Sequence, residues 1–273
     1  MKKTRKLLVV LLVLSLLVSF LPQDASASES YTRLAGQTRY QTSKAVAESF
    51  NSGQVDNVVI ATGNDFADAL SVSVLAGQKD APILLANQTT SKSQEALDYI
   101  SKHMSRGKVW IAGGTGVIDS SFKSKLDSMG NSVERIAEND RYGTCLAIAE
   151  KVNARQGTPV FIASGENFPD ALSIASAAAS RGYPIILSRK NALPNGVENY
   201  LSRQQPSEVF IIGGTGVISP SVESNIKAIL PAASVTRIAG QDRFETSSAA
   251  YEQFFPNPSS IYIASGMDFA DAL

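Results

Sequence analysis

One block of sequence occurs three times in this chain at a fixed interval, and this repetition constrains the fold more than any other feature. The copies RLAGQTRYQTS, RIAENDRYGTC and RIAGQDRFETS begin at Arg33, Arg135 and Arg237, so successive copies start 102 residues apart. A second block follows as ATGNDFADAL, ASGENFPDAL and ASGMDFADAL, and a third appears twice, as IAGGTGVI and IIGGTGVI. The chain is therefore a tandem array of modules of about 100 residues, the size of one small domain.

The repeat divides the chain into four segments. We assign residues 1–27 to a leader, 29–130 to module 1, 131–232 to module 2 and 233–273 to an incomplete module 3. Module 3 has 41 residues and no counterpart of the PILL or GGTG segments, so we expect the chain to be a truncated protein or a fragment of a longer one. Similar modules present similar surfaces side by side. Such an array suits the binding of a repetitive ligand better than catalysis at a single site.

The leader has the layout of a secretory signal peptide. Basic residues within 2–6 precede an apolar run of 15 residues at 7–21, and Ala25-Ser26-Ala27 offers a cleavage site. A membrane anchor is the alternative, but a span needs about 20 apolar residues. We expect export and cleavage, with no stable membrane insertion afterwards.

Charge and cysteine content narrow the classes of function. Removal of residues 1–27 takes away four basic residues and Asp24, which leaves 21 basic and 24 acidic residues and a formal charge of −3. Such a chain has no bulk attraction for nucleic acid, so any anion must be bound by local arginines. A single cysteine allows no intramolecular disulfide, and we interpret Cys145 as a small packed residue rather than a catalytic thiol.

Apolar periodicity within a module predicts alternating strands and helices. Strands are expected at short β-branched or apolar runs, which in module 1 are 56–61, 82–85 and 108–112, and a further strand at 132–137 leads into the next repeat. Helices are expected at 66–77, 91–104 and 120–129. Central strands that are apolar throughout are typical of a parallel sheet covered on both faces. The predicted fold class is α/β, built from tandem modules that each have a mainly parallel sheet with helices on both faces, packed pseudo-symmetrically.

Pairs of arginines six residues apart are the strongest candidates for ligand contact. Each second arginine follows a potential helix cap (Thr38, Asp140 or Asp242) and precedes a threonine by three positions. An arginine at a helix start can clamp phosphate or carboxylate through two hydrogen bonds. The candidate ligand-binding residues are Arg33, Arg39, Arg135, Arg141, Arg237, Arg243, Thr42, Thr144 and Thr246. The alternative is a structural role, in which the arginines tie modules together through ion pairs with repeated acids such as Asp68 and Asp170.

Two further motifs mark turns from strand to helix. The motif G-x-x-F-[AP]-D-A-L lies where open α/β sheets commonly bind ligands. Its aspartate also suits the helix dipole, so we assign the repeated aspartates to a module interface or groove, namely Asp68, Asp170 and Asp271. The GGTG segments match no nucleotide-binding glycine motif, so tight turns account for them.

Catalysis has little support in the sequence. The chain has one histidine, His103, on a polar helical stretch. A zinc hydrolase needs several His, Asp or Glu ligands, and nothing places a serine beside His103 for a Ser-His-Asp triad. We expect no catalytic residue, metal or cofactor in this chain.

The motifs R-[LI]-A-x-x-x-R-[YF]-x-T, G-x-x-F-[AP]-D-A-L, P-I-[LI]-L and I-x-G-G-T-G-V-I, in this order and behind a leader, resemble the cell-wall-binding repeat type 2 family of Gram-positive bacteria. The resemblance covers residues 31–273. It implies three modules around a pseudo-threefold axis, secretion to the cell wall, and an anionic wall polymer such as teichoic acid or a secondary polysaccharide as ligand. It also implies that Pro82 and Pro184, in the PILL and PIIL segments, lie near module contacts or the groove.

The function that the resemblance implies is non-covalent attachment of an exported protein to the wall. Members of the family often carry an N-acetylmuramoyl-L-alanine amidase as effector, so a wall hydrolase is an expected partner. The alternative is that this chain is the targeting part of such an autolysin, with its catalytic domain elsewhere. A solute-binding protein with one cleft between two lobes is disfavoured, because it would not need a third copy of the repeat.

Overall fold

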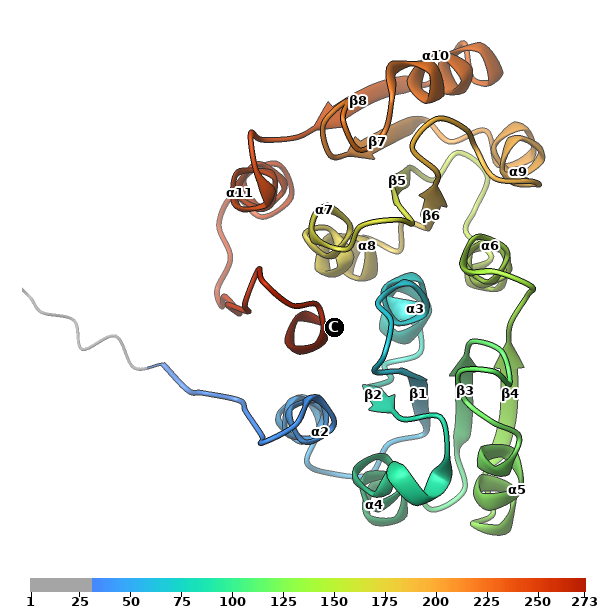
Figure 1. Ribbon diagram of the computed structural model, residues 1–273, viewed down its shortest axis with the longest axis vertical. Helices are drawn as coiled ribbons and strands as arrows, with labels where there is room; N and C mark the ends of the chain where they lie inside the picture. Colours follow the sequence, from blue (N-terminus) through green and yellow to red (C-terminus); the bar gives the residue numbers. More distant parts are fainter. Residues whose placement is uncertain (1–30) are drawn as a thin grey trace, which may run out of the picture. The chain divides into compact units, whose positions relative to one another are not determined.

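Two parallel sheets of four strands each form the framework of the molecule (Figure 1). The structure is a computed structural model that describes residues 31–273, of which 34–273 form one compact unit. The predicted signal peptide at 1–27 lies outside the described residues. Within the described part of the chain, no helix combines the length and the apolar character of a membrane span.

The first sheet has the strand order β2-β1-β3-β4, and all neighbouring strands are parallel. Its strands are β1 (Asn57–Thr62), β2 (Ile83–Ala86), β3 (Lys108–Ala112) and β4 (Ser132–Ile136). The chain runs from β1 outward to β2 and then crosses back to β3. The turns that follow β1 and β3 therefore diverge at the carboxyl edge of the sheet, which is where open α/β sheets place their ligands.

The second sheet repeats this arrangement in the order β6-β5-β7-β8. Its strands are β5 (Val160–Ser164), β6 (Ile185–Ser188), β7 (Glu208–Ile212) and β8 (Ser234–Ile238). The central strands of both sheets are buried almost throughout, since helices cover both faces.

Each sheet takes its fourth strand from the next repeat. By sequence β4 falls in module 2 and β8 in module 3, yet β4 pairs with β3 and β8 pairs with β7. The sheets therefore end one strand beyond the module boundaries that the repeat suggests. This sharing ties consecutive modules together through backbone hydrogen bonds.

The helices alternate with the strands, so the predicted α/β class with helices on both faces is confirmed. Around the first sheet lie α2 (Arg39–Phe50), α3 (Ala67–Gln78), the 3-10 turn η1 (Thr90–Lys92), α4 (Gln94–His103) and α5 (Ser121–Ser128). Around the second lie α6 (Arg141–Val152), α7 (Pro169–Leu172), α8 (Ala175–Arg181), α9 (Val197–Gln204) and α10 (Pro220–Ile229). Module 3 contributes α11 (Arg243–Phe254) and the 3-10 turn η2 (Ala270–Ala272).

The helices that open each repeat begin at the predicted caps. Thr38 accepts a hydrogen bond from the Gln41 amide, and Asp140 accepts one from the Gly143 amide. Asp242 accepts two, from the amides of the second and third residues of α11. These side chains satisfy backbone donors that have no partner within the helix.

The apolar core continues from the first sheet into the second. A single cluster contains Val59 of β1, Leu70 of α3 and Phe161 of β5. Helix α3 lies between its own sheet and helices α6 and α8 of the second module. A Cβ added to Gly77 of α3 would lie 3.1 Å from the carbonyl oxygen of Ala179 in α8. The small residues of α3 thus allow the two modules to pack closely.

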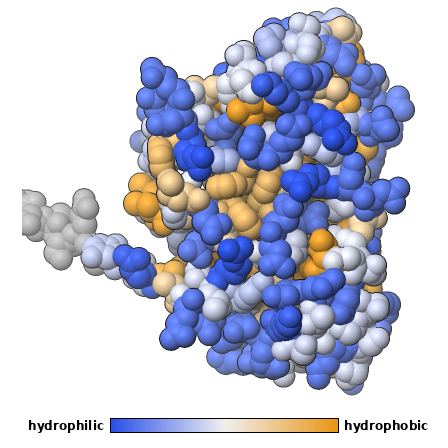
Figure 2. All heavy atoms as spheres, in the orientation of Figure 1, coloured by the Kyte–Doolittle hydropathy of each residue, from blue (hydrophilic) through white to orange (hydrophobic). Residues whose placement is uncertain are grey.

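Module 3 packs through its helical elements, with α11 against α7 and η2 against α2. Residues 260–264 correspond to β1 and β5 in the repeat, but they form no strand, and no described strand pairs with them. Ile261, Tyr262 and Ile263 are accordingly 64%, 83% and 94% exposed. Figure 2 shows apolar surface at this edge of the molecule, on its left.

Candidate functional site

Three phenylalanines of the repeated G-x-x-F motif meet where the modules join. Phe66, Phe168 and Phe269 lie directly before α3, α7 and η2. Their ring centroids are 6.2 Å (Phe66–Phe168), 6.4 Å (Phe66–Phe269) and 5.9 Å (Phe168–Phe269) apart. These tilted and edge-to-face contacts are the favourable geometry for aromatic pairs. The triangle marks a pseudo-threefold axis, and weakly apolar surface gathers there with hydrophilic residues around it (Figure 2).

The second arginine of each repeat surrounds this triangle. Arg39, Arg141 and Arg243 are the first residues of α2, α6 and α11. Each Nη1 donates to a glycine carbonyl of its own module, with distances of 2.5, 2.8 and 2.7 Å to Gly63, Gly165 and Gly266. Each guanidinium also lies over a phenylalanine of another module, at 5.2 Å (Phe269), 5.7 Å (Phe66) and 5.6 Å (Phe168) from the ring centroid. Every arginine therefore bridges two modules.

Ion pairs complete two of these three bridges. Arg141 Nη2 lies 2.8 Å from Asp65, and Arg39 Nη2 lies 3.5 Å from Asp268. The expectation that Asp68 and Asp170 supply the partners was wrong, because the pairing acid stands three positions earlier in the motif. The signal was present in the sequence, since the residue before the phenylalanine reads Asp, Asn and Asp in the three copies.

The first arginine of a repeat holds the glycine turn after the third strand of the preceding sheet. Arg135 Nη1 donates to the Gly113 carbonyl at 2.6 Å, and Arg237 Nη1 donates to the Gly213 carbonyl at 2.8 Å. Arg237 also pairs with Glu223 at 2.9 Å. Arg33 is exposed.

The three candidate threonines are buried under the turn that opens each repeat. Thr42, Thr144 and Thr246 are 7%, 2% and 2% exposed. Each hydroxyl accepts a hydrogen bond from the backbone amide six residues earlier, at 3.0–3.1 Å. These contacts hold the turn that presents the second arginine.

The repeated aspartates of the G-x-x-F-[AP]-D-A-L motif lie close to the GGTG turns. Gly113 has a φ of +108°, and a Cβ there would lie 2.5 Å from Asp68 Oδ2. Gly213 has a φ of +107°, and a Cβ would lie 2.6 Å from Asp170 Oδ2. The first glycine of GGTG is thus required both by the left-handed backbone and by the carboxylate next to it. Asp271, in η2, is exposed.

Burial perturbs these carboxyl groups. It raises the pKa of Asp68 from 3.8 to about 6, the charge of Asp65 adds to the rise, and Arg141 opposes it. Burial also raises the pKa of Asp170, while the Thr246 hydroxyl and the charge of Arg243 act in the opposite direction. Both aspartates therefore sit near an inter-module arginine without forming an ion pair with it.

The prolines of the PILL and PIIL segments are buried at the start of β2 and β6. The carbonyls of Pro82 and Pro184 accept from the Val59 and Phe161 amides at 3.0 and 2.9 Å. Cys145 packs against β6, with its Sγ 3.1 Å from the Ile185 carbonyl oxygen. Burial raises the pKa of this thiol to about 11, which agrees with the interpretation of Cys145 as a packed residue.

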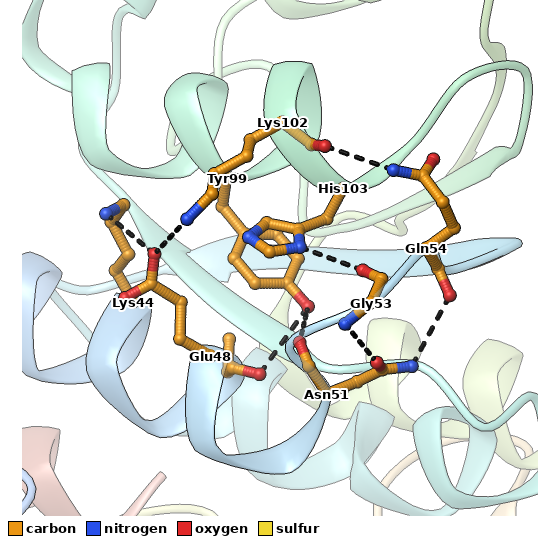
Figure 3. Close-up of polar contacts among 9 residues, drawn as sticks. Lys44, Glu48, Asn51, Gly53, Gln54, Tyr99, Lys102 and His103 are labelled. Atoms are coloured by element: carbon orange, nitrogen blue, oxygen red, sulfur yellow. Dashed lines mark hydrogen bonds and ion pairs between the residues drawn. The ribbon is translucent and has the colours of Figure 1, made fainter.

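His103 belongs to a structural cluster between α2 and α4 (Figure 3). His103 lies on a helix, as expected, but its side chain is only 3% exposed, and its ring stacks on Tyr99 at a centroid distance of 4.5 Å. Its Nδ1 lies 2.8 Å from the Gly53 carbonyl oxygen, and the Tyr99 hydroxyl donates to the Asn51 carbonyl at 3.2 Å. Within the described residues no serine is hydrogen-bonded to this imidazole, and no group of three or more His, Cys, Asp or Glu side chains could hold a metal ion.

Comparison with known proteins decides the family. The profile of cell wall binding domain 2 (CWB2) matches residues 33–123, 135–223 and 237–273. The chain belongs to the CWB2 family. The three CWB2 matches follow the three copies of the arginine and G-x-x-F motifs, which are the residues that meet at the pseudo-threefold axis.

Two curated relatives contain similar CWB2 sequence. N-acetylmuramoyl-L-alanine amidase LytC of Bacillus subtilis is 30% identical over 257 residues, which are 94% of this chain and 49% of LytC. The amidase enhancer of the same organism is 33% identical over 245 residues, which are 88% of this chain and 32% of the enhancer. The CWB2 chain thus spans half or less of the length of these relatives.

Two solved structures share the CWB2 fold. Cwp6 from Clostridium difficile superposes with a TM-score of 0.74 at 30% identity, over 86% of this chain and 38% of Cwp6. Cwp8 from the same organism gives a TM-score of 0.73 at 29% identity, over 81% of this chain and 37% of Cwp8. The arrangement of the CWB2 modules described above therefore recurs in Cwp6 and Cwp8.

Proposed function

We propose that this chain attaches an exported protein non-covalently to the Gram-positive cell wall by binding an anionic wall polymer, either a teichoic acid or a secondary polysaccharide. The observation that carries the proposal is the repetition of one arginine site around a pseudo-threefold axis. A polymer that repeats its charge can contact several such sites at once, and linked weak contacts give a high overall affinity.

The arginines carry the ligand contacts in this proposal, and the other candidate residues shape the sites. Arg39, Arg141 and Arg243 are partly exposed, so their guanidinium groups remain accessible to an oxyanion. Arg135 and Arg237 add positive charge near the GGTG turns, and Arg33 is an exposed candidate of the same motif. The buried threonines Thr42, Thr144 and Thr246 hold the turns that present the second arginines. Pro82 and Pro184 pair with the central strands β1 and β5, close to the module interfaces in this proposal. In this proposal the repeated aspartates Asp68, Asp170 and Asp271 line the module interface or groove beside the arginines.

The test is sedimentation of the purified chain with isolated Gram-positive walls, before and after acid extraction of their anionic polymers. We expect binding to native walls that weakens as the salt concentration rises, because the attraction is ionic. We expect little binding to extracted walls. Equal binding to native and extracted walls would contradict the proposal.

A second candidate is that the chain is the targeting part of a secreted N-acetylmuramoyl-L-alanine amidase or acts beside such a hydrolase. The similarity to LytC and to the amidase enhancer, each much longer than the matched region, favours this candidate. The chain itself is then a binding module without catalytic activity. A zymogram on cell walls should show no clearing by the chain alone, and clearing would overturn this assignment.

A further inference from the structure

We propose that Arg243 makes the principal charge contact with the anionic polymer, because its inter-module bridge lacks the aspartate that neutralises Arg39 and Arg141. This inference rests on the function proposed above and identifies which of the equivalent arginines is free to bind.

The three bridges share one geometry, but only two of them contain an ion pair. Arg141 pairs with Asp65 at 2.8 Å, and Arg39 pairs with Asp268 at 3.5 Å. Arg243 reaches over Phe168, and the residue before Phe168 is Asn167. An amide cannot form this ion pair, so within the described residues Arg243 is the one arginine of the three bridges without a carboxylate partner.

Other nearby charges do not remove the difference. Asp170 lies close enough for Arg243 to lower its pKa, but Asp68 has the same relation to Arg141. The cap Asp242 precedes Arg243 in the chain just as Asp140 precedes Arg141. These acids are common to the bridges of Arg141 and Arg243. Two further acids near Arg243 have other partners, because Glu166 accepts from the Lys190 amide and Glu245 accepts from the Gln241 amide. The missing ion pair at Asn167 is therefore the distinguishing feature.

Arg243 retains unused donors. Among the described residues its guanidinium donates only to the Gly266 carbonyl, at 2.7 Å through Nη1. The phenylalanine under the guanidinium and the glycine carbonyl fix the plane of the fork, which lowers the entropy lost when an oxyanion binds. A planar fork of this kind matches the two oxygens of a phosphodiester or a carboxylate.

The central experiment is an Asn167→Asp variant of the whole chain, titrated with fluorescently labelled polyglycerol phosphate and, in a second arm, polygalacturonate. The new aspartate should pair with Arg243 as Asp65 pairs with Arg141. We expect the affinity for the polymer to fall about three- to tenfold, which is the usual size of one charged hydrogen-bond contact. The two arms distinguish a phosphodiester ligand from a carboxylate ligand.

A matched control separates a local pair from a general change in charge. Asn64→Asp adds the same charge to the equivalent turn of module 1, where Asn64 is exposed and one position before Asp65. We expect this variant to change the affinity less than twofold. The converse variant, Asp65→Asn, releases Arg141 and should raise the affinity several-fold. It also decides the question should Asn167→Asp fail to fold.

The outcomes separate this inference from the function on which it rests. If the wild-type chain binds but Asn167→Asp binds as tightly as Asn64→Asp, the assignment to Arg243 is overturned while wall binding stands. If Asp65→Asn leaves the affinity unchanged, the assignment is likewise overturned. If the wild-type chain binds neither polymer and no native walls, both proposals fail together.

Discussion

At the scale of single residues, two of the repeated motifs meet in a close contact between a glycine and a carboxylate. The turn after β3 brings Gly113 against the Asp68 carboxylate with a left-handed backbone, and the second sheet repeats this contact with Gly213 and Asp170. A glycine and a buried carboxylate that depend on each other explain why GGTG and the DAL aspartate recur together. Neither residue has to touch a ligand for this pairing to be required.

Replacement of Gly113 by alanine should destabilise the chain by about 1–3 kcal/mol, because the new Cβ meets Asp68 in a strained backbone conformation. Gly114→Ala is the matched control, since an added Cβ there has no atom within 4 Å. Urea unfolding measures both. Equal stability of the two variants would show that the contact with Asp68 is absent.

Asp68 should make the stability of the chain depend on pH. Its pKa is raised to about 6 in the folded state, so its contribution is fully present below about pH 4 and is lost as the pH rises through 6. The Asp68→Asn variant has no carboxyl group to ionise at this position. It should therefore be more stable than the wild-type chain by about 2–3 kcal/mol at pH 7.5, with little difference at pH 4. Thermal unfolding at both pH values checks this, with the exposed Asp271→Asn as control. A gain that is the same at both pH values would contradict the assignment.

At the scale of elements, the sequence predicted most of the strands and helices but not how they are shared. Continuous apolar runs located β1, β2 and β3 to within one or two residues, because strands buried on both faces leave little ambiguity. The repeat interval could not show that β4 completes the preceding sheet, since a repeat has no intrinsic starting point. The helical pattern also does not show that His103 is buried, because its Nδ1 contacts the carbonyl of Gly53, which lies 50 residues earlier in the chain.

The site was predicted less completely than the fold. The arginines were identified from their spacing, whereas their acidic partners were placed three residues too late in the motif. Asp65 and Asp268 make inter-module contacts that depend on how the modules pack, and no local pattern encodes that packing. The candidate role of the arginines and threonines in ligand binding stays a prediction.

The helix that opens module 3 should depend on its cap. Asp242 accepts hydrogen bonds from two amides of α11, both at 2.9 Å. Asp242→Ala should therefore lower the free energy of unfolding by about 1 kcal/mol. Asp242→Asn keeps an acceptor and should cost less than half of that. Chemical unfolding followed by circular dichroism measures both, and identical losses would argue that the charge rather than the cap matters.

At the scale of the whole molecule, the modules within residues 34–273 form one continuously packed unit rather than separate domains. The shared core, the exchanged strands and the three arginine bridges all cross module boundaries. An array built in this way keeps its repeated sites at fixed separations. Rigid spacing allows a polymer of matching period to engage more than one site without a further entropic cost.

Cooperativity can be tested with the single tryptophan, Trp110, which lies in the first sheet. Ile226→Ala creates a cavity in the separate core behind the second sheet and should destabilise the chain by about 2–5 kcal/mol. If the modules unfold together, the fluorescence of Trp110 should report the same lowered midpoint as far-ultraviolet circular dichroism. A tryptophan transition that does not move would show that the first module unfolds alone.

The central claim is that repeated sites on one rigid array hold a periodic anionic polymer at several points. Its most direct test is the affinity of the wild-type chain for anionic wall polymers of increasing length, expressed per repeating unit and measured at fixed salt. We predict a steep rise in affinity once the polymer is long enough to reach from one arginine bridge to the next, followed by a plateau. An affinity per unit that does not change with polymer length would contradict the account.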